Sequence, residues 1–525
     1  MNQLEALNKQ LAEGRLSRRD FMQRAAALGA GAALLSAPTL AATPKRGGHV
    51  RAGWHGGNTT DSLDPTQLTS EFTALVFFTM GSHLTEVAPD GQLVPELAES
   101  YEANADATQW TFDLRKGVEF HNGKTLDADD VIVSIDRHRG EDSKSPTKNL
   151  AESITEMRKD GPNRVIFTLR EGNADFPFIL SSQTFNILPV VDGEVVIGVG
   201  TGGYSLEEFE PGVRCAFKRF PNYFKSDQAF FDSAEITVVA DPTTRQNGLV
   251  TGAFDVIDYV PAATADLLAK KPGIEVDNVT GTLHFTFPMR LDMEPFKGNN
   301  DLRLALKYAF DREDALRQIL RGYGSLGNDH PISPANQFHA GELEQRMYDV
   351  EKAKFHLKKS GHEGFTHELS GSEGLYAGCM DTILLYAEHA KKAGINIVPK
   401  RMPSDGYWSD VWMKHAWGAS YWSGRPTEDW MFSQGYGAES TWNETYWQHE
   451  RFNWLLKTAR AELDQSLRRD MYVEMQQICR DEGGSVIPLF GSHISARSDK
   501  VAHGPNVAGN WEMDGYKWLD RWWFT

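Results

Sequence analysis

The 525-residue sequence carries 72 acidic and 54 basic side chains, a formal net charge of −18 at pH 7. A surface of that sign repels phosphate backbones, which excludes nucleic acid as a general partner. One hydrophobic core rarely organises more than about 250 to 300 residues, so we expect two lobes. Cys215, Cys379 and Cys479 are too few and too scattered for a metal site or a disulfide framework. The sequence leaves undecided whether Cys379 and Cys479 form a single disulfide bond.

Residues 1–41 have the pattern of a targeting segment. Ser17-Arg18-Arg19-Asp20-Phe21 is a twin-arginine motif, an Ala- and Gly-rich run follows over 25–37, and small residues mark a cleavage site near Ala41. The alternatives are an amphipathic helix or a membrane anchor, but the run is near the minimum of about 18 apolar residues for a span. We therefore predict a signal peptide over 1–41, export by the twin-arginine translocase, and a soluble chain in the periplasm.

The first half of the remaining chain alternates strand and helix patterns. A short strand over 49–52 leads into a turn-rich polar stretch, and a helix is predicted over 71–84. Residues 110–114 alternate as a strand does. Asp127 then has the position of a helix N-cap, with Asp130 at the capping-box position.

The second half keeps this alternation. Apolar residues recur with helical spacing from Asn300, and Asp311 is placed to cap a second helix that Gly322 ends. A helix over 384–393 and a strand over 395–398 follow. Strands alternating with helices in both halves predict two α/β lobes.

Five stretches carry a family resemblance. They are Pro95–Tyr101, Trp110–Val131, Gly200–Tyr204, Arg219–Phe224 and Asp349–Lys354. In this order they resemble the family-five extracellular solute-binding proteins, which bind dipeptides, oligopeptides, nickel complexes and some sugars for ABC importers. The resemblance covers nearly all of the chain after the signal peptide.

The resemblance implies a two-lobed clamshell of the type II, cluster C-like kind, with a ligand cleft between the lobes. Lobe I would comprise 45–282 and a return segment 488–525, and lobe II would comprise 283–487. Two crossing strands near Thr282 and Ile487 would form the hinge. The resemblance also implies a periplasmic monomer that works with an ABC permease and ATPase in the inner membrane. It implies no cofactor, no metal and no catalysis.

Motifs of enzyme sites are incomplete. Gly198–Gly203 satisfies G-x-G-x-x-G, but no helix pattern follows, as a dinucleotide site requires. His362 and His367 are spaced one residue too far apart for a zinc helix. We find no nucleophile elbow of the G-x-S-x-G kind.

Eight of the fourteen tryptophans fall between residues 407 and 454. We assign Trp412, Trp447 and Trp454 to the core. The segment 421–430 mixes aromatic and charged residues around a Gly-Arg-Pro turn, which favours a cleft wall. The predicted ligand contacts on lobe II are Trp417, Tyr421, Trp422, Arg425, Glu428 and Asp429. On lobe I they are Ser70, Glu71 and Phe72, where relatives contact ligand.

In peptide-binding relatives an aspartate of the similar segment holds the ligand's ammonium, and here Arg425 stands in its place. Arg425 offers a planar fork of donors for a carboxylate or phosphate, and Glu428 or Asp429 could hold an ammonium nearby. We therefore predict a small peptide or amino-acid-like solute with a carboxylate.

Two other ligand classes stay open. An oligosaccharide binder would explain the tryptophans by stacking, but it would not need Arg425. A nickel or metallophore binder would need clustered histidines, and His83, His121 and His138 do not have a ligand spacing.

Overall fold

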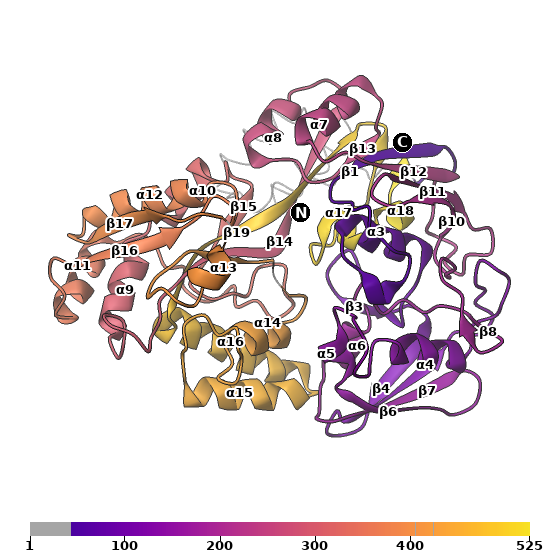
Figure 1. Cartoon of the computed structure of the whole chain (residues 1–525), viewed down its shortest axis with the longest axis horizontal. Coiled ribbons are helices and arrows are strands. Elements are labelled where there is room, and N and C mark those ends of the chain that lie inside the picture. Colours follow the sequence, from indigo (N-terminus) through magenta and orange to yellow (C-terminus); the bar gives the residue numbers. More distant parts are fainter. Residues whose placement is uncertain (1–43, 405, 424) are drawn as a thin grey trace, which may run out of the picture.

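Two lobes lie side by side in the computed structural model, and long strands join them (Figure 1). The structure describes residues 44–404, 406–423 and 425–525. The predicted signal peptide and Gly424 lie outside these ranges. Within the ranges, no helix combines the length and the apolar character that crossing a membrane requires.

A nine-stranded sheet runs through both lobes in the order β10-β11-β12-β1-β13-β19-β14-β18, with β15 pairing β19. Strand β1 is parallel to β12 and β13, and β14 and β19 are antiparallel. The strands are β1 (His49–Trp54), β10 (Tyr204–Glu210), β11 (Arg214–Arg219), β12 (Ser233–Val238), β13 (Val256–Ile257), β14 (Ile274–Pro288), β15 (Gly324–Leu326), β18 (Ser420–Trp422) and β19 (Ser485–Ser498).

The core of lobe I joins residues from both ends of the described chain. Trp54 of β1 packs in one cluster with Trp518 and Trp522, and all three are buried. Around this core lie η2 (Pro65–Gln67), α3 (Glu71–Met80), α7 (Pro242–Thr251), α8 (Ala262–Leu268), α17 (Glu512–Gly515), α18 (Trp518–Arg521), β20 (Val501–Ala502) and β21 (Trp523–Phe524).

A second sheet of lobe I has the order β4-β5-β7-β6. Trp110, Phe112 and Leu114 alternate inward along β5, as the sequence predicts, and pack with the helix α4. Its elements are β4 (Ala98–Ala103), β5 (Gln109–Leu114), α4 (Ala128–Asp136), β6 (Ile154–Lys159) and β7 (Arg164–Leu169). Short elements nearby are β2 (Thr85–Val87), β3 (Leu93–Pro95), α5 (Lys148–Ala151), α6 (Phe176–Ile179), β8 (Val190–Val191) and β9 (Glu194–Val195).

Lobe II surrounds two hydrophobic clusters. One lies among α9 (Asn300–Tyr308), α10 (Arg312–Gln318), α11 (Val350–Lys359), β16 (Thr366–Gly371), α12 (Cys379–Lys391), β17 (Asn396–Arg401) and α13 (Tyr407–Asp410). The other lies among α14 (Glu428–Gly435), α15 (Glu450–Ala461) and α16 (Gln465–Glu482). Cys379 belongs to the first and Cys479 to the second, and both thiols are buried and unpaired, as is Cys215.

Several local predictions are confirmed. Asp127 caps α4, and the carboxylate of Asp130 accepts the N–H of Asp127, which completes the capping box. Asp311 caps α10. The helix predicted over 71–84 ends at Met80, because Gly81 leaves helical geometry.

The glycine-rich stretch before β10 has a packing role. A Cβ at Gly200 would lie 2.1 Å from the carbonyl oxygen of Met80, so only glycine fits against the end of α3. Strand β10 follows where a dinucleotide site needs a helix, in agreement with the sequence analysis.

Strands β14 and β19 pair along nearly their whole lengths and carry the chain between the lobes (Figure 1). Val276 at one end of β14 packs with a cluster around β13, whereas Phe285 and Phe287 at the other end pack in lobe II. The register shifts between Thr280 and His284, where the strands leave one lobe for the other.

The C-terminal segment contacts this crossing. A Cβ at Gly509 would lie 2.1 Å from the carbonyl oxygen of Thr280, whereas one at Gly504 would have no neighbour closer than 3.9 Å. We expect Gly509→Ala to lower the free energy of unfolding by about 1–3 kcal/mol, because the backbones must move apart. Gly504→Ala, the control, should change it by less than about 0.5 kcal/mol. Urea denaturation measures both, and equal midpoints would contradict the predicted contact.

Candidate functional site

Arg425 follows strand β18 and lies between two indole rings. Its guanidinium carbon is 5.4 Å from the ring centroid of Trp422 and 5.8 Å from that of Trp430. Its Nε donates to Oε1 of Gln434 at 2.6 Å. Burial lowers the pKa of Arg425 to about 10, so the side chain stays cationic at neutral pH.

A group of aromatic residues continues from Trp422 to the surface of lobe II. We call Trp408, Trp412, Tyr421, Trp422 and Trp442 the aromatic wall, because their rings contact one another in series. Trp408 and Trp442 are 46% and 44% exposed. The outer end of the wall is therefore exposed to solvent.

A buried carboxyl group holds the wall in place. Glu444 accepts the indole N–H of Trp412 at 2.5 Å and that of Trp422 at 3.0 Å. Burial raises the pKa of Glu444, while these hydrogen bonds oppose the shift. The two indole N–H groups thus have an acceptor inside the lobe, and their ring faces are fixed.

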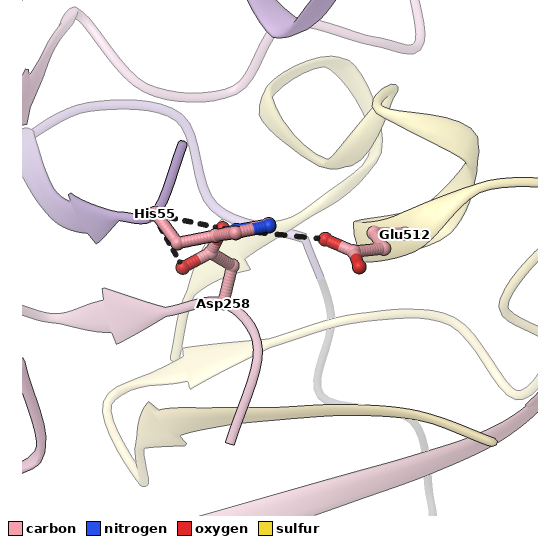
Figure 2. A group of neighbouring side chains, drawn as sticks. All are labelled: His55, Asp258 and Glu512. Carbon is pink, nitrogen blue, oxygen red and sulfur yellow. Dashed lines mark hydrogen bonds and ion pairs between the residues drawn. The ribbon is translucent and has the colours of Figure 1, made fainter. Parts of the chain in front are cut away.

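On lobe I, His55, Asp258 and Glu512 come together from three distant segments (Figure 2). His55 follows β1, Asp258 follows β13, and Glu512 begins α17. Asp258 accepts a hydrogen bond from the backbone N–H of His55 at 3.0 Å, and it also contacts Nδ1 of the His55 imidazole. The same Nδ1 lies 3.8 Å from Oε2 of Glu512. Glu71, at the start of α3, accepts a hydrogen bond from the Tyr516 hydroxyl. We call His55, Glu71, Asp258 and Glu512 the lobe I cluster.

Charge and burial shift the titration of this cluster. Burial lowers the pKa of His55, but the hydrogen bond and charge of Asp258, with Glu512 and Glu71, raise it to about 9. Burial raises the pKa of Glu512 to about 8, and Asp258 and Glu71 add to this while His55 opposes it. At neutral pH the imidazole is therefore charged and Glu512 holds a proton.

An exposed tyrosine of lobe I lies against the cluster. Tyr259 stacks on His55 with ring centroids 4.8 Å apart and is 56% exposed. Burial raises the pKa of Tyr259, and the charge of Glu512 adds to this shift.

A small pocket, partly open to solvent, is lined by both lobes. Its wall includes Phe178 and Asn510 on lobe I, Thr282 at the crossing, and Pro426 and Glu428 on lobe II.

Four of the predicted lobe II contacts lie at or beside this site, and two do not. Tyr421 and Trp422 belong to the wall, Arg425 lies against it, and Glu428 lines the pocket. Asp429 forms an ion pair with Arg460 at 3.1 Å. Trp417 is buried in the core of lobe II, and its indole donates to the carbonyl of Phe287.

The lobe I predictions divide in the same way. Glu71 joins the cluster, Ser70 caps α3 through its hydroxyl, and Phe72 is buried in the lobe I core. Among the tryptophans assigned to the core, Trp447 is buried, but the prediction for Trp454 is wrong, because that side chain is 52% exposed on α15.

The sequence analysis missed His55, Asp258 and Glu512. His55 and Asp258 each come directly after one of two neighbouring parallel strands, β1 and β13, and that position is a usable signal. Glu512 has no such signal, since its place depends on the return of the chain to lobe I.

We expect Glu444→Leu to lower the free energy of unfolding by about 2 kcal/mol or more, because two buried indole N–H groups would lose their acceptor. Tryptophan emission should shift to longer wavelength as water reaches the rings. Glu439→Leu, at an exposed site nearby, is the control. Unchanged stability and emission in Glu444→Leu would show that the carboxyl group does not hold the wall.

Comparisons with known proteins agree with this architecture. The Glutathione-binding protein GsiB of Salmonella choleraesuis (strain SC-B67) is 25% identical over 506 residues, covering 93% of this chain and 96% of that protein. The Dipeptide-binding protein of Escherichia coli (strain K12) is 25% identical over 468 residues, covering 79% and 83%. The structure of HbpA2 from Haemophilus parasuis matches with a TM-score of 0.78 at 20% identity, covering 89% of this chain and 99% of that one.

The model of a protein family, described as "Bacterial extracellular solute-binding proteins, family 5 Middle", matches residues 92–444. This range is more than half of the chain, and it includes the aromatic wall, Arg425 and the first crossing strand. The protein therefore belongs to family 5 of the bacterial extracellular solute-binding proteins.

Proposed function

We propose that this protein is the periplasmic substrate-binding component of an ABC importer. It captures a small peptide or amino-acid-like solute with a carboxylate and delivers it to the permease. The observation that carries the solute class is Arg425, a cation held between two indoles beside the pocket shared by the lobes. Two matched relatives are named for binding glutathione and dipeptides, which carry such groups.

The mechanism follows from the guanidinium and its surroundings. Nearby indole rings exclude water, so a bidentate pair with a carboxylate gains strength there. A solute that contacts both lobes favours the closed arrangement by its differential affinity. Strands β14 and β19 would act as the hinge, between lobe I (45–282 and 488–525) and lobe II (283–487).

A thermal-shift screen tests the proposal, because a solute that binds only the folded state raises the melting temperature. It should include short peptides, amino-acid derivatives, opine-like conjugates, oligosaccharides and nickel salts. We expect stabilisation by carboxylate-bearing peptides or amino-acid-like solutes, and a smaller radius of gyration by X-ray scattering when the solute is bound. Stabilisation by oligosaccharides alone would favour stacking on Trp408 and Trp442 instead. Turnover of a bound solute would contradict a role in binding alone.

Arg425→Ala should weaken binding of the identified solute by about thirtyfold or more, since losing a desolvated charge partner costs about 2 to 5 kcal/mol. Arg425→Lys should recover only part, because an ammonium lacks the planar fork. The matched control is Arg451→Ala. Arg451 also lies over an indole, that of Trp454, but it is exposed and paired with Glu474. Full affinity in Arg425→Ala would remove Arg425 from the site.

The export route is part of the proposal. Replacing Arg18 and Arg19 with lysine should leave the precursor in the cytoplasm, because the twin-arginine translocase recognises the arginine pair. Fractionation of cells and immunoblotting measure this. Periplasmic accumulation of the variant at the level of the unchanged protein would exclude this route.

A further inference from the structure

Two buried oxygen atoms, one in the lobe I cluster and one close to it in the sequence, have no hydrogen-bond partner in the described chain. Oε2 of Glu512 is buried and has no hydrogen-bond partner there. Oδ1 of Asn510, two residues earlier, is also buried without a hydrogen-bond partner in the described residues. Asn510 lines the pocket between the lobes. Buried polar atoms are normally paired, so each of these two oxygens can accept a hydrogen bond from a bound donor.

The carboxyl groups of the cluster outnumber the cations beside them. Asp258 is matched by Arg245, whose Nε lies 3.4 Å from it and whose guanidinium also donates to the carbonyls of Val239, Ala240 and Tyr259. The His55 imidazolium then remains to balance Glu71 and Glu512. Three carboxylates therefore face two cations, and burial leaves Glu512 protonated with a pKa of about 8.

Backbone geometry places the other two carboxyl groups, those of Glu71 and Glu512, close to His55. The N–H of Phe72 donates to the carbonyl of Gly56 at 3.1 Å, which sets Glu71 beside His55. On the other side, Met513 and Tyr516 have φ of 48° and 62°, in the left-handed region that few side chains adopt. Such strain persists where surrounding structure enforces it, commonly at binding sites.

We propose that Glu512 and Glu71 receive the ammonium group of the transported solute, while Arg425 on lobe II receives its carboxylate. This inference rests on the proposed function and specifies its substrate class as a zwitterionic peptide or amino-acid derivative. In this arrangement the cationic end of the solute contacts lobe I, and its anionic end contacts lobe II. Of the two residues predicted from the sequence to hold the ammonium, Asp429 is paired with Arg460, and the carboxyl group of Glu428 accepts a hydrogen bond from the backbone N–H of Phe338.

The donor set favours an organic cation over a metal ion. His55, Asp258 and Glu512 place ligand atoms within 4.8 Å of one another, a spacing that a divalent ion could use (Figure 2). However, Nδ1 of His55 already contacts the carboxylate of Asp258. The same carboxylate accepts a hydrogen bond from the backbone N–H of His55 and lies beside the guanidinium of Arg245. A metal would have to displace the imidazole proton close to a guanidinium. An ammonium needs only acceptors, which the cluster has.

A pH effect follows from the same geometry. Glu512 faces His55, Asp258, Glu71 and Arg245, as well as the phenols of Tyr259 and Tyr516. It is protonated below pH 8 in the solute-free protein. An ammonium pairs with the carboxylate, so binding at pH 6.5 should release close to one proton, and affinity should rise with pH towards 8. Calorimetry in two buffers of different ionisation enthalpy counts the protons released.

The test uses glutathione and the dipeptide Ala-Glu, each beside its N-acetylated form, at pH 6.5. We expect the free forms to bind at least tenfold more tightly than the acetylated forms. Glu512→Gln should remove both this preference and the proton release while the solute-free melting temperature at pH 7 is kept, because glutamine replaces an already neutral carboxyl group. Glu207→Gln, at an exposed carboxylate of β10, is the control and should behave as the unchanged protein.

Three results would overturn the inference. The first is equal binding of free and acetylated forms, and the second is unchanged preference in Glu512→Gln. The third is stabilisation by NiCl₂ or ZnCl₂ alone that EDTA and His55→Ala abolish, which would assign the cluster to a metal. Binding of carboxylates regardless of the ammonium group would overturn only the proposed ammonium subsite. Stabilisation by none of the solutes would overturn the proposed function as well.

Discussion

The pairing of β14 with β19 is the constraint on which the rest of the molecule depends. Each strand extends from one lobe into the other, and its two ends pack in different hydrophobic clusters. Because the strands are antiparallel neighbours, the chain leaves lobe I and returns to it at the same place. The lobes are thus joined covalently by two adjacent backbones, and any hinge motion between the lobes must bend this pair of strands.

The two halves of the candidate site are built by different means. On lobe II, indole rings are fixed through the buried carboxyl group of Glu444, and a cation lies against their faces. On lobe I, carboxyl groups gather at the ends of neighbouring strands and beside a strained turn. One half is aromatic and positive, and the other is acidic. A solute with opposite charges at its two ends would be oriented by this difference before the lobes close.

Much of the fold could be predicted from the sequence, because its signals are local. Asp127 and Asp311 mark helix starts through their own side chains, and the alternation of Trp110, Phe112 and Leu114 shows a half-buried strand. The site was predicted less fully, because its geometry depends on contacts between distant residues. Composition favoured the segment around Arg425 as a cleft wall, but Asp429 of that segment and the preceding Trp417 turn inward. No local pattern relates Glu512 to His55, which lies hundreds of residues earlier.

The shared core of lobe I has a consequence for the order of folding. Trp54 packs against Trp518 and Trp522, so this core is unfinished until almost the whole chain has left the ribosome. Lobe II, in contrast, is built almost entirely from one continuous stretch, and it has all its strands once β19 has emerged. A growing chain would therefore expose the apolar surface of Trp54 and its neighbours in lobe I until the last segment arrives. That intermediate would be the species most in need of a chaperone.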